Sequence, residues 1–97
     1  MNETIDDLTI AFSEDGVLVT KELGKQVLTK GAWTTILYRY QDMDKATKTY
    51  SPVKYSIRRY QKRNNQYWQK SKFNISSDAQ ARLIINILTE WLEQAAT

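Results

Sequence analysis

The chain has 97 residues, of which 41% are apolar and 26% are charged, with a net charge of +3, and these values fit one folded domain rather than a disordered chain. It contains no cysteine and no histidine, which excludes disulfides and removes the commonest general base and metal ligand, so we expect no enzyme, metal, cofactor or small-molecule substrate. Its apolar stretches are too short to cross a bilayer, and a cytoplasmic protein without a membrane partner is expected.

The amino-terminal stretch 1–15 is acidic, with five carboxylates and no lysine or arginine. We predict a partly disordered arm here, although Leu8, Ile10 and Phe12 alternate as they would in a short edge strand. A turn sequence follows this arm. The folded domain is therefore expected to cover residues 16–97.

The stretch from Val17 to Ile75 is rich in β-branched and aromatic residues, which favour extended strands. Breaks are predicted at Gly24, at the polar loop 42–51 and at the hairpin turn 63–65, where asparagine tolerates positive φ. The four main strands are expected at residues 17–23, 33–41, 53–62 and 66–75, and residues 26–30 are a candidate for a further short strand.

The pattern changes at Ser77, because Ser77 and Gln80 have the spacing of a capping box, which begins a helix. From Asp78 to about Ala95, apolar side chains recur every three or four residues, as on one face of an amphipathic helix. The predicted fold class is therefore α+β, with an antiparallel sheet of about four strands followed by one C-terminal helix, in the order β-β-β-β-α.

The apolar stripe of this helix is wide, and one face of the sheet is not expected to cover all of it. A helix from a second copy of the chain would complete its burial, which predicts a homodimer. The alternative is that the chain before residue 24 folds over the stripe. The stripe residues expected at the dimer interface are Ile84, Leu88, Trp91 and Leu92.

Positive charge is concentrated in residues 45–77, which hold nine lysines and arginines and no acidic residue. Such an asymmetric distribution indicates an anionic partner more strongly than the overall charge does. The competing interpretation is an ordinary solvated face. The nine cationic residues are Lys45, Lys48, Lys54, Arg58, Arg59, Lys62, Arg63, Lys70 and Lys72.

Alternation of side chains places cations and aromatic rings together on one face of the strands 53–62 and 66–75. Cations neutralise phosphates, and flat rings stack on unpaired bases, which favours single-stranded nucleic acid over duplex. The opposing interpretation is that these rings pack in the core. With contributions from neighbouring strands, the predicted nucleic-acid-binding residues are Lys30, Trp33, Arg39, Lys54, Arg58, Tyr60, Lys62, Trp68, Lys70 and Lys72.

Two short motifs precede the predicted helix. Residues 57–60 read I-R-R-Y and residues 72–76 read K-F-N-I-S. With the helix that follows, this order resembles the transcriptional positive cofactor four family of single-stranded DNA binders, whose pattern is roughly I-R-E-Y, a turn, K-G-I-S and a terminal helix. That family shares a superfamily with the Whirly proteins.

The resemblance implies a homodimer with a four-stranded sheet in each subunit, and Arg58 and Lys72 match the basic contacts to single-stranded DNA. The aromatic residue that follows I-R-E-Y in the family corresponds to Gln61 here. Either Tyr60 or Trp68 would have to supply the stacking ring in its place.

These patterns lead to one preferred hypothesis and two alternatives. The preferred one is a non-enzymatic single-stranded DNA-binding protein with weak sequence preference, cytoplasmic or nucleoid-associated, acting in transcription, replication or repair. The first alternative is RNA binding, because a basic sheet with stacking rings serves RNA equally well. The second is a protein-interaction module that uses the apolar stripe of the helix.

Overall fold

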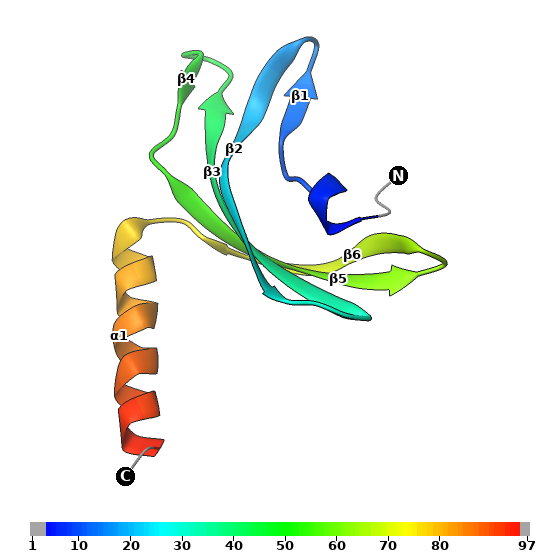
Figure 1. Cartoon of the computed structure of the whole chain (residues 1–97). Helices are drawn as coiled ribbons and strands as arrows, with labels where there is room; N and C mark the ends of the chain where they lie inside the picture. Colours follow the sequence, from blue (N-terminus) through cyan, green and yellow to red (C-terminus); the bar gives the residue numbers. More distant parts are fainter. Residues whose placement is uncertain (1–3, 96–97) are drawn as a thin grey trace.

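A computed structural model describes residues 4–95 as a curled antiparallel sheet followed by one helix (Figure 1). The β-branched and aromatic stretches form strands and the capping-box segment begins the helix, so the α+β class is confirmed. None of the helices in the described residues combines the length and the apolar character needed to cross a membrane. The elements in chain order are the 3-10 helix η1 (Ile5–Asp7), β1 (Phe12–Glu14), β2 (Val17–Thr29), β3 (Trp33–Asp44), β4 (Thr49–Tyr50), β5 (Lys54–Arg63), β6 (Gln66–Ile75) and α1 (Asp78–Ala95).

The sheet has more strands than the four that the residue pattern predicts. Two of the strands, β1 and β4, are short additions to the sheet. β1 pairs with β2, and β4 pairs with β3. In addition, β2 is one continuous strand where the sequence predicts a break at Gly24. The register shifts between Glu22 and Gly24, so the glycine lies at an irregularity in the strand and does not end it. The strand order β1-β2-β3-β5-β6 makes β6 an edge of the sheet.

Two tight turns use residues that tolerate positive φ. Asn64 and Asn65 connect β5 to β6 with φ angles of 52° and 62°, the combination that a type I′ hairpin turn requires. Asp15 and Gly16 connect β1 to β2 with φ angles of 52° and 78°. The hairpin predicted at residues 63–65 is therefore confirmed.

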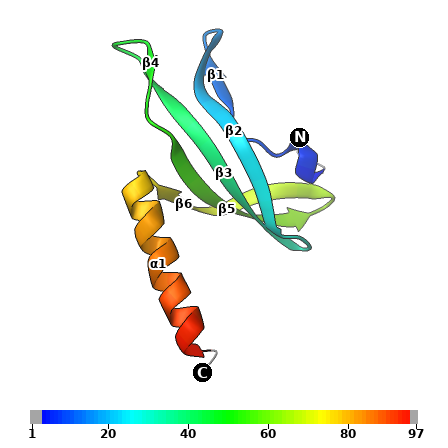
Figure 2. The ribbon, with the colours of Figure 1, turned by 60° about the vertical axis from the view of Figure 1, so that its left-hand side comes forward.

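The sheet has an inner face, on which the amino-terminal segment 4–11 lies, and an outer face, which continues toward α1 (Figures 1 and 2). Leu8 and Ile10 of this segment are buried against side chains of β3 and β5. The segment thus covers the sheet, and not α1 as the alternative for the chain before residue 24 supposed. Residues 1–3 of the expected arm lie outside the described residues. The buried cluster on the inner face consists of Leu8, Ile10, Ile36, Tyr38, Tyr40 and Tyr60.

The start of α1 is held by the side chains that the capping motif predicts. Ser77 Oγ accepts a hydrogen bond from Gln80 N at 3.1 Å, and Gln80 Oε1 accepts one from Ser76 N at 3.0 Å. The Tyr55 hydroxyl donates to Asp78 Oδ1 at 2.9 Å, which ties the first turn to β5.

Beyond its first turns, α1 extends away from the sheet (Figures 1 and 2). The radius of gyration is 15.8 Å, compared with roughly 12–13 Å for a compact chain of this length. The apolar stripe is consequently exposed, with Trp91 at 62% and Leu92 at 70%. The outer face beside it also leaves Phe73 52% exposed.

Candidate nucleic-acid interface

The register of β3, β5 and β6 brings several of the predicted cations onto the inner face. Arg58 stands opposite the buried Ile36 on one side and opposite Lys72 on the other. Lys54 stands opposite the buried Tyr40. Because residues directly opposite each other in an antiparallel sheet share a face, Lys54, Arg58 and Lys72 face the same way, away from the outer face that leads to α1.

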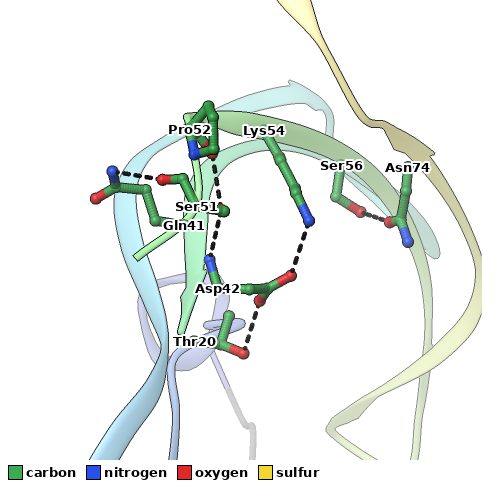
Figure 3. A network of polar contacts seen from close by, with 8 residues as sticks. All are labelled: Thr20, Gln41, Asp42, Ser51, Pro52, Lys54, Ser56 and Asn74. Atoms are coloured by element: carbon green, nitrogen blue, oxygen red, sulfur yellow. Dashed lines mark hydrogen bonds and ion pairs between the residues drawn. The ribbon is translucent and has the colours of Figure 1, made fainter. Parts of the chain in front are cut away.

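Arg58 is positioned by neutral hydrogen-bond partners. Its Nε donates to Ser56 Oγ at 3.1 Å, and its Nη1 donates to Gln69 Oε1 at 3.1 Å. Ser56 Oγ in turn donates to Asn74 Oδ1 at 2.7 Å (Figure 3). Neither ion pair found among residues 4–95 involves Arg58 or Lys72. Their two positive charges are therefore not neutralised by a carboxylate of the described chain.

Lys54 differs from these two cations because it faces a carboxylate. Its Nζ lies 3.5 Å from Asp42 Oδ2, and Asp42 Oδ1 accepts a hydrogen bond from Thr20 Oγ1 at 3.2 Å (Figure 3). The backbone N–H of Asp42 donates to Ser51 Oγ at 3.1 Å, so the aspartate is held in place from the β4 side as well. The charge of Lys54 is therefore partly neutralised by Asp42, and Lys54 should attract an anion less strongly than Arg58 or Lys72.

Tyr60 is on the inner face, as predicted, but it cannot serve there as a stacking ring. Only 4% of it is exposed, because it belongs to the core cluster that Leu8 and Ile10 complete. Its hydroxyl oxygen shares a hydrogen bond of 3.0 Å with that of Tyr38. The interpretation of Tyr60 as a core residue is thus the correct one.

Burial governs the ionisation of this phenol pair. Burial raises the pKa of Tyr38 well above its ordinary value, and the hydrogen bond and the proximity of Tyr60 raise it further. Burial also raises the pKa of Tyr60, against a smaller lowering by the hydrogen bond with Tyr38. Both phenols therefore stay neutral at physiological pH and act as structural groups.

The segment that covers Tyr60 is anchored by two charged residues of β2. Lys25 Nζ donates to the backbone oxygens of Ile5 at 2.5 Å and Leu8 at 2.6 Å. Glu22 Oε1 accepts hydrogen bonds from Thr9 Oγ1 at 2.7 Å and from the backbone N–H of Ile10 at 3.3 Å. Sequence reasoning missed these anchors, and its only signal for the contact was the apolar alternation of Leu8 and Ile10.

Trp68 lies on the outer face, and not beside Lys72 as simple alternation predicts. Arg59 pairs with Ser71, but the next residue, Tyr60, pairs with Gln69, so one residue of β6 is extra at this point. Such a bulge reverses the facing of the residues beyond it. Trp68 therefore stands opposite Gln61, which in turn stands opposite Trp33.

The ten predicted binding residues are consequently divided by the fold. Lys70 is the extra residue of the bulge, and Lys30 is exposed in the turn that follows β2. Lys62 is on the inner face, with its Nζ 5.4 Å from the centre of the Tyr67 ring. Arg39 stands opposite Tyr55 and is exposed on the outer face, together with Trp33 and Trp68. The inner face keeps Lys54, Arg58, Lys62 and Lys72.

The four residues predicted for a dimer interface are placed on α1 as the helical pattern requires. Leu88, Trp91 and Leu92 are exposed, and Ile84 is half-buried. Ile84 lines a largely apolar cleft between α1 and the outer face, which also includes Ile57 and Ile75. No side chain of the described segment 4–95 covers the carboxy-terminal end of this stripe.

No group of three or more potential metal-ligating side chains is clustered in residues 4–95. Comparison with protein-family models, curated proteins and solved structures finds no match to this chain.

Proposed function

We propose that this protein binds single-stranded nucleic acid, with DNA as the first candidate, and that it does so without enzymatic activity and with weak sequence preference. The observation that carries the proposal is the pairing of Arg58 with Lys72 on the inner face, where neither charge has a carboxylate partner in the described chain. Phosphate groups are the anions that such a pair fits, because binding them releases condensed counterions.

The rigidity of Arg58 supports this role. Its guanidinium is held by Ser56 and Gln69, so little side-chain entropy is lost when it meets a phosphate. Arg58 also lies between the buried residues Ser56 and Tyr60 on β5, an interior strand of the sheet, and a side chain on such a strand is held more precisely than one on a loop. The resemblance of residues 57–60 and 72–76 to a family of single-stranded DNA binders points to the same two cations.

A homodimer formed through α1 is part of the proposal. The exposed stripe on α1 and the half-covered outer face are apolar surfaces that a monomer leaves in contact with water. A second copy would bury both surfaces and bring two inner faces into one assembly. Such a protein would act on exposed single strands in transcription, replication or repair, in the cytoplasm or at the nucleoid.

The double variant Arg58→Glu/Lys72→Glu tests the proposal in a fluorescence-anisotropy titration with a labelled dT oligomer. The wild-type protein should bind with micromolar or higher affinity at about 50 mM salt, and the affinity should fall steeply as salt rises. The double variant should bind at least about tenfold more weakly, and the slope of log K against log salt should become shallower by about 0.7 for each phosphate that the variant no longer neutralises.

Lys48→Glu is the matched control, because it reverses an exposed charge at the turn before β4 and should leave binding nearly unchanged. Absence of binding by the wild-type protein at about 50 mM salt would refute the proposal. Competition between dT and rU oligomers of equal length decides between DNA and RNA, since nothing in the proposed contact reads a 2′-hydroxyl.

A further inference from the structure

Two tryptophans remain exposed at the hairpin end of the outer face. Trp33 is 39% exposed and Trp68 is 50% exposed, and they flank Gln61 in one row across β3, β5 and β6. Two strand spacings separate them, which is about 10 Å. Two large rings in one row on a water-facing surface are unusual in a small monomer, and they are not part of its core.

The row is accompanied by positive charge. The Arg59 guanidinium lies 4.2 Å from the centre of the Trp33 ring, in cation–π contact. Beside Trp68, the side chains of Arg63 and Lys70 line a shallow surface hollow. None of the residues 45–77 is acidic, so the strands β5 and β6 offer this patch no competing carboxylate.

The bulge in β6 creates this arrangement. With regular alternation, Trp68 would face inward beside Lys72; the extra residue Lys70 turns it to the outer face, in line with Trp33. A bulge of this kind turns a side chain to the other face and disrupts the strand pairing locally. Bulges are over-represented next to functional sites. Because β6 is an edge strand, the inner and outer faces meet at its free edge, and Trp68 and Lys72 are four residues apart along that strand.

We propose that Trp33, Arg59 and Trp68 form a base-stacking site on the outer face, separate from the phosphate-binding cations of the inner face. One single strand would pass around the β6 edge, with its phosphates on Arg58 and Lys72 and its unpaired bases on the two indoles. This inference rests on the proposed single-strand binding and adds the site that selects unpaired bases.

A nucleobase fits this patch better than a second copy of the chain does. Two copies that met through it would bring Arg59, Arg63 and Lys70 of each against the same charges of the other, and such repulsion disfavours the contact. A polyanion with flat rings matches both the charge and the exposed indoles.

The test compares two ligands of equal length, a dT oligomer and an abasic oligomer that has the same sugar–phosphate backbone without bases. Trp68→Ala should weaken binding of the dT oligomer by about tenfold and leave binding of the abasic oligomer unchanged. Trp68→Phe, which keeps a flat ring, should restore most of the affinity. Phe12→Ala, which removes a similarly exposed ring from β1, should change neither affinity.

Several outcomes would overturn the stacking site. If Trp68→Ala changes neither affinity while Arg58→Glu/Lys72→Glu still weakens both, the stacking site is wrong and the proposed function stands. Equal weakening of both ligands by Trp68→Ala also overturns it, as does a change in oligomer mass on sedimentation, which would show an interface between copies. If the wild-type protein binds neither oligomer, both proposals fail together. Circular dichroism of each variant checks that it is folded.

Discussion

The inner and outer faces of the sheet are completed in different ways. On the inner face, the chain supplies its own cover: Leu8 and Ile10 come back over Tyr38 and Tyr60, and Lys25 fixes the covering segment by its backbone oxygens. On the outer face, α1 leaves the sheet and its apolar stripe stays exposed, as do Trp33 and Trp68 at the far end.

The contrast shows that one face mainly buries side chains and the other mainly leaves them exposed to solvent. The inner face holds the core that stabilises the monomer, and only its β5–β6 part carries open cations. The outer face buries Ile75 but leaves Phe73 and Trp68 exposed, and the apolar stripe of α1 is exposed as well. Substitutions in the covered core of the inner face should therefore act mainly on folding, whereas those at its open cations or on the outer face should act mainly on binding and assembly.

The largest effect is expected from Leu8→Ala, which tests the burial on the inner face. Leu8 is 1% exposed, so its truncation leaves a cavity over the tyrosines and should lower the free energy of unfolding by about 2–5 kcal/mol. Leu28→Ala, at a position 53% exposed on β2, should cost about 0.5 kcal/mol or less. Urea unfolding followed by circular dichroism measures both. Equal, small effects would mean that the amino-terminal segment contributes nothing to the core.

A somewhat smaller effect is expected from Leu88→Asp on the outer side. A charge in the middle of the stripe should weaken the proposed dimer by about 2–4 kcal/mol and shift the protein to a monomer on sedimentation equilibrium. Asn86→Asp adds the same charge to a different side of α1 and should leave the mass unchanged. A wild-type protein that is already monomeric at high micromolar concentration would rule out the dimer.

The smallest effect is expected from the Tyr38–Tyr60 pair, and it tests how much the inner face contributes to stability at high pH. The native pKa values of Tyr38 and Tyr60 are raised, so above the unfolded value of about 10 the unfolded chain releases protons that the folded chain keeps. Stability that is fully present below pH 10 should therefore be lost above it, by up to about 1.4 kcal/mol per pH unit for each tyrosine.

Tyr38→Phe should reduce that loss, because one of the two groups no longer titrates. Urea unfolding at several pH values from 8 to 11, with the wild-type protein measured in parallel, provides the comparison. An unchanged dependence on pH in the variant would show that these phenols do not limit alkaline stability.

Local patterns predicted much of the fold from particular residues. Asn64 and Asn65 indicate the hairpin because they tolerate positive φ, and Ser77 and Gln80 indicate the helix start because their side chains satisfy its free N–H groups. Alternation also placed Arg58 on the inner face, since β5 is regular up to that point. Whether these residues bind nucleic acid stays a prediction.

Other features depended on contacts that no local pattern contains. Trp68 changed faces because one residue of β6 is extra in its pairing with β5, and pairing involves two strands at once. Tyr60 was buried because Leu8, which is far away in the chain, lies over it. Neither event alters the local residue pattern by which a strand is recognised.

The sequence by itself determined the α+β class, the hairpin turn, the capped helix and the charge of the 45–77 stretch, because propensity, turn chemistry and composition act over a few neighbouring residues. Only the tertiary structure decided which rings are buried, which face Trp68 occupies and what the amino-terminal segment covers. Those outcomes depend on register between strands and on burial by distant residues, which is where the free energy of folding is gained.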